Sequence, residues 1–327
     1  MPRLVVARKD QIDAIYRESH AVWGAGLTPD AYRDLWDDVS HTPWAQRWAR
    51  FYLLVDDEER ILSSLKLYLP LIRFRGATER NCVLSAIFTP RRRRQRGYAR
   101  ALVERVLDVA RREGCSLALL FSDIGEAYYR SMGFMALRAE EQSAPLRVGG
   151  TPPPGSEWSL RPAEDRDLQA VHEAHRAFTA TQPFSIVRDQ EHWSFLRTRS
   201  AQFFTRLGDG AVDQHFRIVT RAGGFAGYLM TSEGRGEWNV REVGAAAGDP
   251  ALMADVFRTG AHAARRSGLR RFTGWLPSEV VQHLPEWRMN VRPRRMAVPM
   301  IRALDPKLRF DGLRAFPAVF IPYQDQF

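Results

Sequence analysis

The segment from Ile87 to Arg100 has residue types and spacing suited to binding a phosphate group. An apolar stretch runs into a loop with arginine at positions 91–94 and 96, and the loop leads into a helical pattern. Free N–H groups at a helix start bind phosphate, and guanidinium groups add charge and paired donors. Gly97 and Ala99 leave room for a phosphate to approach. The segment predicts a phosphate site, with a solvated basic turn or a nucleic-acid patch as the alternative.

The elements that must position this loop follow from hydrophobic periodicity. Residues 98–113 carry an apolar stripe at helical spacing, and Gly114 closes it, which predicts a helix. In the first half we further expect helices at 9–23 and 126–132 and strands at 50–55, 61–74, 81–88, 116–121 and 134–147. In the second half we expect helices at 161–178 and 250–267 and strands at 216–220, 225–231, 238–246, 270–276 and 294–304.

Two short motifs carry a family resemblance. Arg94-x-x-Gly97-x-Ala99 resembles the acetyl-CoA motif of the GNAT N-acetyltransferase superfamily, and Tyr128-Tyr129-Arg130-Ser131-Met132-Gly133-Phe134 resembles a downstream signature of that family. The resemblance covers about residues 1–145. It implies a mixed sheet that splays beside the strand at 83–89, with the pantetheine arm of acetyl-CoA in the gap and the pyrophosphate on the loop amides.

The resemblance also implies which residues bind the cofactor acetyl-CoA, and separately we expect no metal. Two cysteines alone do not make a zinc site. The implied cofactor-binding residues are Ile87, Phe88, Thr89, Arg94, Gln95, Arg96, Gly97, Tyr98, Ala99 and Arg100, together with Ser122 near the position where many members have an asparagine.

Acyl transfer to an amine needs a proton acceptor and a proton donor. Tyr129 stands four residues before Gly133, at the family's acid position, so the resemblance implies that it protonates the departing thiolate. The alternative is a core tyrosine with a bonded hydroxyl. We expect its neighbour Tyr128 to pack inward.

The proton acceptor is less obvious, because the strand at 81–88 lacks the glutamate of many members. Glu79 lies at the strand entrance. The chain also resembles the enhanced-intracellular-survival type of acetyltransferase, in which the C-terminal carboxylate acts as base. We therefore hypothesise that Phe327 supplies its carboxylate as the catalytic base. The alternative is a tail that packs on the second unit.

The chain divides at a Gly- and Pro-rich segment. We expect a catalytic GNAT domain at 1–147, a linker at 148–157, a degenerate GNAT-like domain at 158–305 and a tail at 306–327. The fold class is α/β (α+β): two tandem GNAT-like units, each a mixed, mostly antiparallel twisted sheet flanked by helices. The second unit lacks an arginine cluster before its helix at 250, and Asp249 would repel phosphate, so we expect it to be structural.

Composition limits the partners. The 327 residues carry a net charge of +10, but 48 basic residues include lysine only at positions 9, 66 and 307, an arginine skew typical of GC-rich coding. We therefore do not expect a nucleic-acid partner. No apolar run approaches the roughly 20 residues of a membrane span, and no signal peptide is recognisable, so we expect no membrane partner and a cytoplasmic location. The pattern leaves the oligomeric state open.

These observations together predict an acetyl-CoA-dependent N-acetyltransferase. Its acceptor would be a primary amine of a small molecule or a peptide. The amine would attack the thioester of acetyl-CoA directly, in a ternary complex. The alternative is a protein without turnover, either an acyl-CoA-binding sensor or a basic protein associated with nucleic acid.

Overall fold

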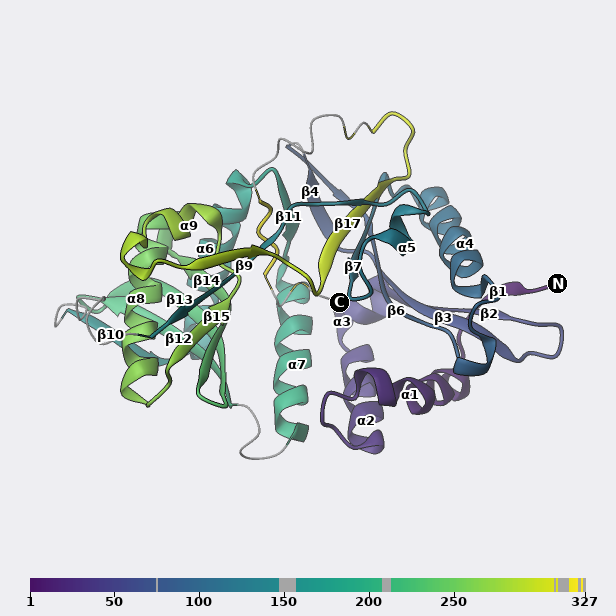
Figure 1. Cartoon of the computed structure of the whole chain (residues 1–327), viewed down its shortest axis with the longest axis horizontal. Coiled ribbons are helices and arrows are strands. Elements are labelled where there is room, and N and C mark those ends of the chain that lie inside the picture. Colours follow the sequence, from purple (N-terminus) through teal and green to yellow (C-terminus); the bar gives the residue numbers. More distant parts are fainter. Residues whose placement is uncertain are drawn as a thin grey trace.

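The computed structural model describes residues 1–74, 76–146, 157–207, 213–308, 310, 318–322 and 325. Two units lie side by side, and each is built on a mixed sheet of seven strands (Figure 1). The predicted fold class is therefore confirmed.

The first sheet has one parallel pair near its centre. Its strands are β1 (Arg3–Val6), β2 (Ala49–Val55), β3 (Ile61–Tyr68), β6 (Cys82–Phe88), β7 (Leu117–Ser122), β17 (Val298–Ala303) and β8 (Met135–Ala136), in that spatial order. Every recorded pairing in this sheet is antiparallel except that of β6 with β7. This parallel pair forms the scaffold of the site described below.

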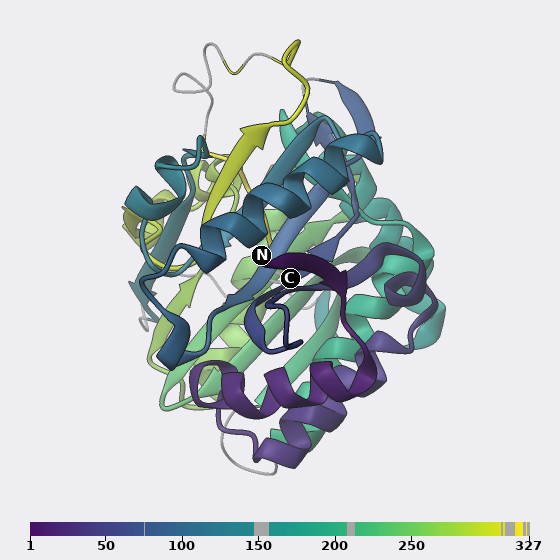
Figure 2. The same cartoon turned by 90° about the vertical axis from the view of Figure 1, so that its right-hand side faces the viewer.

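Helices cover both faces of the first sheet. They are α1 (Lys9–Trp23), α2 (Pro29–Ser40), α3 (Pro43–Trp48), α4 (Tyr98–Arg112) and α5 (Ala127–Arg130). Thr28 and Thr42 cap α2 and α3, each followed by a proline that lacks the N–H a helix start leaves unpaired. Helix α4 buries the predicted apolar stripe against the sheet. Figure 2 shows α4, in blue, across the strands, with α1 and α2, in purple, at the other side.

The second sheet repeats this plan. Its strands are β10 (Trp158–Pro162), β12 (Asp213–Arg221), β13 (Gly224–Gly234), β14 (Glu237–Ala245), β15 (Arg271–Gly274), β9 (Glu140–Pro145) and β16 (Asn290–Pro293), in spatial order. Its helices are α6 (Leu168–Thr181), α7 (Gln190–Leu207), α8 (Pro250–Arg266) and α9 (Ser278–Gln282). A small third sheet joins the units through β11 (Phe184–Val187), β4 (Leu71–Phe74) and β5 (Ala77–Arg80).

The two units exchange a strand. β9 comes from the first half of the chain but lies between β15 and β16, and β17 comes from the second half but lies between β7 and β8. Figure 1 shows β17, in yellow, beside β7, and β9, in teal, within the other unit. Each of the two large sheets therefore contains one strand from the other sequence interval, 1–147 or 158–305. Hydrophobic pattern predicts that a segment is extended, but not which sheet it joins.

Several predicted boundaries need correction. The expected strand at 61–74 is two strands, β3 and β4, because Pro70 lies between them and cannot donate a ladder hydrogen bond. The expected helix at 161–178 begins only at Leu168, after strand β10. The long helix α7 was not predicted. The expected helix at 9–23 is confirmed at both ends, and that at 98–113 to within one residue.

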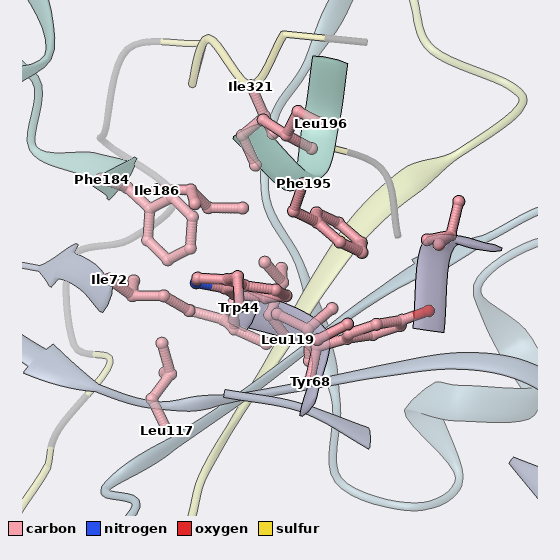
Figure 3. Close-up of a cluster of buried hydrophobic side chains, with 14 of the residues drawn as sticks. Trp44, Tyr68, Ile72, Leu117, Leu119, Phe184, Ile186, Phe195, Leu196 and Ile321 are labelled. Atoms are coloured by element: carbon pink, nitrogen blue, oxygen red, sulfur yellow. The ribbon is translucent and has the colours of Figure 1, made fainter. Parts of the chain in front are cut away.

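The units share one hydrophobic core. Trp44 of α3 packs against Phe195 of α7 with 4.7 Å between ring centroids, and it stacks on Tyr68 of β3 (Figure 3). Val319 and Ile321 of the C-terminal segment are buried in the same core. The described part of the tail is therefore packed between the units.

A buried charge cluster holds the tail to the second unit. The Arg188 guanidinium donates to both carboxylate oxygens of Glu242, at 2.9 and 2.8 Å, and to Asp325 at 2.8 Å. All three side chains are at most 1% exposed. The Tyr228 hydroxyl also donates to Glu242, at 2.7 Å.

None of the helices in the described part of the chain has both the length and the apolar character that crossing a membrane requires.

Candidate active site

The centre of the first sheet opens into a notch. β6 and β7 pair only from Cys82–Leu84 with Ala118–Leu120, although both strands continue beyond those residues. Ala86 has a left-handed φ of 47°, and the pairing of β6 with β3 shifts register nearby. Such a bulge bends a strand and increases its twist. It therefore turns β6 away from β7, and the recorded pairing of the two strands ends at Leu84.

The arginine-rich loop follows directly from β6. A 3-10 turn at Arg91–Arg93 and a left-handed Gln95 lead to Gly97, the N-cap of α4 with φ 77°. A Cβ on Gly97 would meet nothing within 4 Å. Among the described residues, no hydrogen bond is recorded from the backbone N–H groups of 98–100. The predicted helix start with open amides is therefore present, surrounded by exposed arginines.

A cleft of about 630 Å³ extends from this loop through the notch, within the size range of small-molecule sites. We call it the notch cleft. Its lining residues come from both faces of the sheet: Val22, Trp23, Tyr32, Trp36, Lys66, Leu84, Ser85, Ala86, Ile87, Phe88, Thr89, Arg94, Ala99, Leu120, Phe121, Asp123, Ile124, Tyr128, Tyr129 and Ala297.

The predicted cofactor residues divide into three groups by place. Five of them line the notch cleft, namely Ile87, Phe88, Thr89, Arg94 and Ala99. Four others, Gln95, Arg96, Gly97 and Tyr98, form the turn and the helix start. The Arg100 side chain instead donates to the Ser131 carbonyl at 3.0 Å and ties α4 to α5.

Ser122 does not line the cleft. Its side chain is buried, and its hydroxyl donates to the Gly125 carbonyl at 2.6 Å. The next residue, Asp123, lines the cleft and accepts a hydrogen bond from the Ala297 N–H at 2.8 Å. Asp123 therefore links the cleft wall to the chain entering the exchanged strand β17.

Tyr129 lies in the cleft with a buried ring. It is 8% exposed and packs edge-on against Tyr128 and Phe134. Burial, with smaller effects from Tyr128 and Asp123, raises the pKa of Tyr129 to about 12. The hydroxyl is therefore protonated at neutral pH, as a proton donor must be. No described residue is recorded as its hydrogen-bond partner.

Tyr128 corrects an expectation. Its side chain is 37% exposed, so Tyr129 and not Tyr128 packs inward. The short helix α5 turns the two adjacent tyrosines in different directions, and periodicity over four residues is too short to predict which one is buried.

Of the two carboxylates proposed as base, Glu79 belongs to the described residues and does not line the notch cleft. Glu79 lies on β5, before β6 begins, and accepts a hydrogen bond from the Ser116 hydroxyl at 2.9 Å. The notch lies at the other end of β6, so the structure excludes Glu79 as the base. Phe327 lies outside the described residues, so its role stays a prediction.

Sequence reasoning missed Lys66. This side chain is 7% exposed and lines the cleft, with Nζ at 3.4 Å from the centroid of Trp36 and 5.0 Å from that of Tyr16. Burial, followed by the charge of Arg199, lowers the pKa of Lys66 well below its usual value. None of the ion pairs recorded for the described residues includes Lys66. The available signal was a single lysine within an apolar strand, because lysine is rarely buried.

The corresponding loop of the second unit is closed. The Asp249 carboxylate caps α8 by accepting from the Ala251 N–H at 2.8 Å, and Pro250 has no N–H. A Cβ on Gly248 would stand 2.4 Å from the backbone nitrogen of Phe178, so α6 covers this turn. The second unit therefore lacks the open helix start of the first. Across the described residues, no group of three His, Cys, Asp or Glu side chains is placed to hold a metal.

A splayed parallel pair beside an open helix start defines a fold with a notch for an extended ligand. Residues 5–136 match the family model for the acetyltransferase (GNAT) domain. No curated protein matches the chain in sequence.

Solved structures similar to the whole chain include three of this class. A GCN5-related N-acetyltransferase from Anabaena variabilis has a TM-score of 0.71 at 14% identity, with 93% of this chain and 73% of that chain covered. A probable N-acyltransferase from Enterococcus faecalis has a TM-score of 0.68 at 13% identity, with 93% of this chain and 73% of that chain covered. A tandem GNAT protein from the clavulanic acid biosynthesis pathway has a TM-score of 0.56 at 12% identity, with 94% of this chain and 100% of that chain covered. At these identities the likeness shows the fold.

The first unit is therefore an acetyltransferase domain of the GNAT family, and the chain as a whole has the tandem GNAT fold. The match of residues 5–136 supports acyltransferase activity for the first unit.

Proposed function

We propose that the chain transfers an acetyl group from acetyl-CoA to a primary amine of a small molecule or a peptide, by direct attack in a ternary complex. The observation that carries the proposal is the continuity of the notch cleft with the open helix start of α4. An extended thioester with a diphosphate at one end fits a site with amides at one end and a narrow strand gap at the other.

The reaction needs few groups in this site. The pyrophosphate would lie on the amides at Gly97–Arg100, with Arg94 beside it. The pantetheine arm would follow β6 through the notch, beyond its last pair with β7, where a backbone N–H can stabilise the negative charge that develops on the carbonyl oxygen. Tyr129 would give its proton to the departing sulfur, since a thiol with a pKa near 8.5 leaves more easily when it is protonated.

Thiol release tests this proposal. With acetyl-CoA and a panel of primary amines, we expect release of free CoA thiol above the rate without amine, and acetylated amine of equal amount by mass spectrometry. The control is the same panel with acetyl-CoA and heat-denatured protein. If acetyl-CoA binds tightly but no amine raises thiol release, the chain is an acyl-CoA-binding protein without turnover.

A further inference from the structure

A second cavity adjoins the notch cleft on the opposite side of the sheet from α4. It holds about 200 Å³ and lies among α1, α2, β2, β3 and α7. Aromatic rings of Tyr16, Phe51 and Phe195 line it, and Lys9 and Asp37 pair at its rim. Lys66 and Trp36 line both this cavity and the notch cleft. The two cavities therefore meet at these two side chains.

The strand pattern places Lys66 and Tyr129 on opposite faces of the sheet. Leu65 and Leu67 of β3 pack into the core beneath α4, and Tyr129 joins that same core. Because side chains alternate along a strand, Lys66 points to the other face, where Phe51 is its neighbour on β2. On its other side, Lys66 pairs with Ser85, the first residue of β6 beyond the last pair with β7. Lys66 thus stands at the mouth of the notch, facing the second cavity.

We propose that Lys66 is the catalytic base of the acyl transfer, and that the amine acceptor reaches the thioester through the cavity lined by Tyr16, Trp36 and Phe51. This inference rests on the function proposed above. It gives the reaction a proton acceptor from the described part of the chain, in place of the strand glutamate that the sequence lacks.

The proton transfers balance for an acceptor that binds as the neutral amine. The amine lone pair forms a C–N bond with the thioester carbonyl carbon, and Lys66 Nζ takes a proton from that nitrogen. The C–S bond breaks, its electron pair goes to sulfur, and the Tyr129 hydroxyl protonates the sulfur. Lys66 then returns its proton through water to the Tyr129 oxygen, so the enzyme is restored with no net proton change.

The surroundings favour a neutral Lys66. Desolvation in an apolar pocket disfavours an ammonium group, and the aromatic faces only partly replace the lost water. The same cavity would disfavour a charged acceptor, which suits an amine with an apolar body. The titratable and charged groups that line this cavity or act on its tyrosines and lysine are Lys9, Asp13 and Tyr16 of α1, Tyr32 and Asp37 of α2, Arg50 of β2, Tyr68 of β3, and Arg199 of α7.

Selective labelling tests the ionisation of Lys66 without any turnover. The chain has three lysines, so ¹³Cε-lysine labelling gives three signals, and Lys66→Met identifies one of them. We expect that signal to titrate well below the ordinary lysine value of 10.5. A Lys66 signal that titrates at or above 10.5 would overturn the proposal.

The kinetic test uses a weakly basic amine such as a hydrazide, whose own titration lies below the range measured. For the wild type, kcat is expected to rise with pH to a plateau, because protonated Lys66 is inactive. Lys66→Met should lower kcat by about 10²-fold or more and lose this rise, with the Kd for CoA within twofold. Lys66→Arg should be equally impaired, since arginine does not release its proton. Lys307→Met is the matched control and should behave as the wild type.

The outcomes separate the two proposals. Substantial activity in Lys66→Arg, or a pH profile unchanged in Lys66→Met, would show that Lys66 only supplies charge or packing. If deletion of Phe327 removed the pH-dependent rise while Lys66→Met kept it, the base would be the C-terminal carboxylate. If no amine supported turnover in the wild type, the proposed function would fail, and the labelling experiment would still decide whether Lys66 is neutral.

Discussion

Replacing Arg188 with methionine is expected to lower the free energy of unfolding by about 3–5 kcal/mol, the usual result of removing one partner from a buried ion pair. The substitution leaves the carboxylates of Glu242 and Asp325 buried without their guanidinium partner. Urea unfolding followed by circular dichroism measures the loss. The matched control is Arg33→Met: Arg33 pairs with Asp30 and Asp34 at the surface, and its removal should cost less than about 1 kcal/mol.

The pH dependence gives this prediction a second readout. Burial alone would raise the pKa of Glu242, but the charge of Arg188 and hydrogen bonds from His175 and Arg188 outweigh it and hold the pKa at about 2. A lowered carboxyl pKa stabilises the fold above its ordinary value of 4.5, and this contribution is lost as pH falls toward 2. The gap in stability between wild type and Arg188→Met should therefore narrow below pH 4.5. A gap under 1 kcal/mol at neutral pH would contradict the account of the cluster.

Tyr129→Phe is expected to reduce kcat by about 10²-fold or more while leaving the fold intact, because the change removes one hydroxyl with no recorded partner among the described residues. The departing thiolate then has to leave without a positioned proton. Because the pKa of Tyr129 is raised to about 12, its hydroxyl stays protonated in the resting enzyme between pH 6 and 9. Ionisation of Tyr129 should therefore not change kcat in this range. Steady-state kinetics with saturating acetyl-CoA measures the effect.

Tyr128→Phe is the matched control for this experiment. Tyr128 lies at the rim of the same cleft on the same helix, and it is 37% exposed. We expect its kcat to stay within a few-fold of the wild type. Equal kcat for Tyr129→Phe and wild type would assign Tyr129 to packing alone, which is the alternative already raised by the sequence.

The sequence predicted most of the arginine-rich loop because each part of it depends on local chemistry. Gly97 is required where φ is 77°, the arginines carry their charge in any context, and the stripe of α4 follows from helical period alone. The same local logic predicted that Asp249 would repel phosphate at the second loop, and in the structure this carboxylate caps α8.

The sequence could not predict features that depend on distant pairing. The exchange of β9 and β17 depends on which distant strands each of them pairs with. The position of Lys66 depends on α1, α2 and α7 closing over one face of β3, which brings together residues far apart in the chain. Glu79 was weighed as a base because it is close to β6 in sequence, but strand direction places it at the wrong end.

Calorimetric titration with CoA tests most directly the claim that open amides at the start of α4 bind the cofactor. We expect one binding site per chain, since the helix start of the second unit is capped. Gly97→Ala should weaken binding at least about tenfold, or about 1.4 kcal/mol, by placing a methyl group where the pyrophosphate lies.

Gly114→Ala is the matched control. Gly114 follows the C-terminal end of the same helix with φ 89°, and a Cβ there would also meet nothing within 4 Å, so both variants bear the same backbone strain. The account predicts weaker CoA binding for Gly97→Ala and unchanged binding for Gly114→Ala. Equal affinities in the two variants, or no heat of binding with the folded wild type, would contradict it.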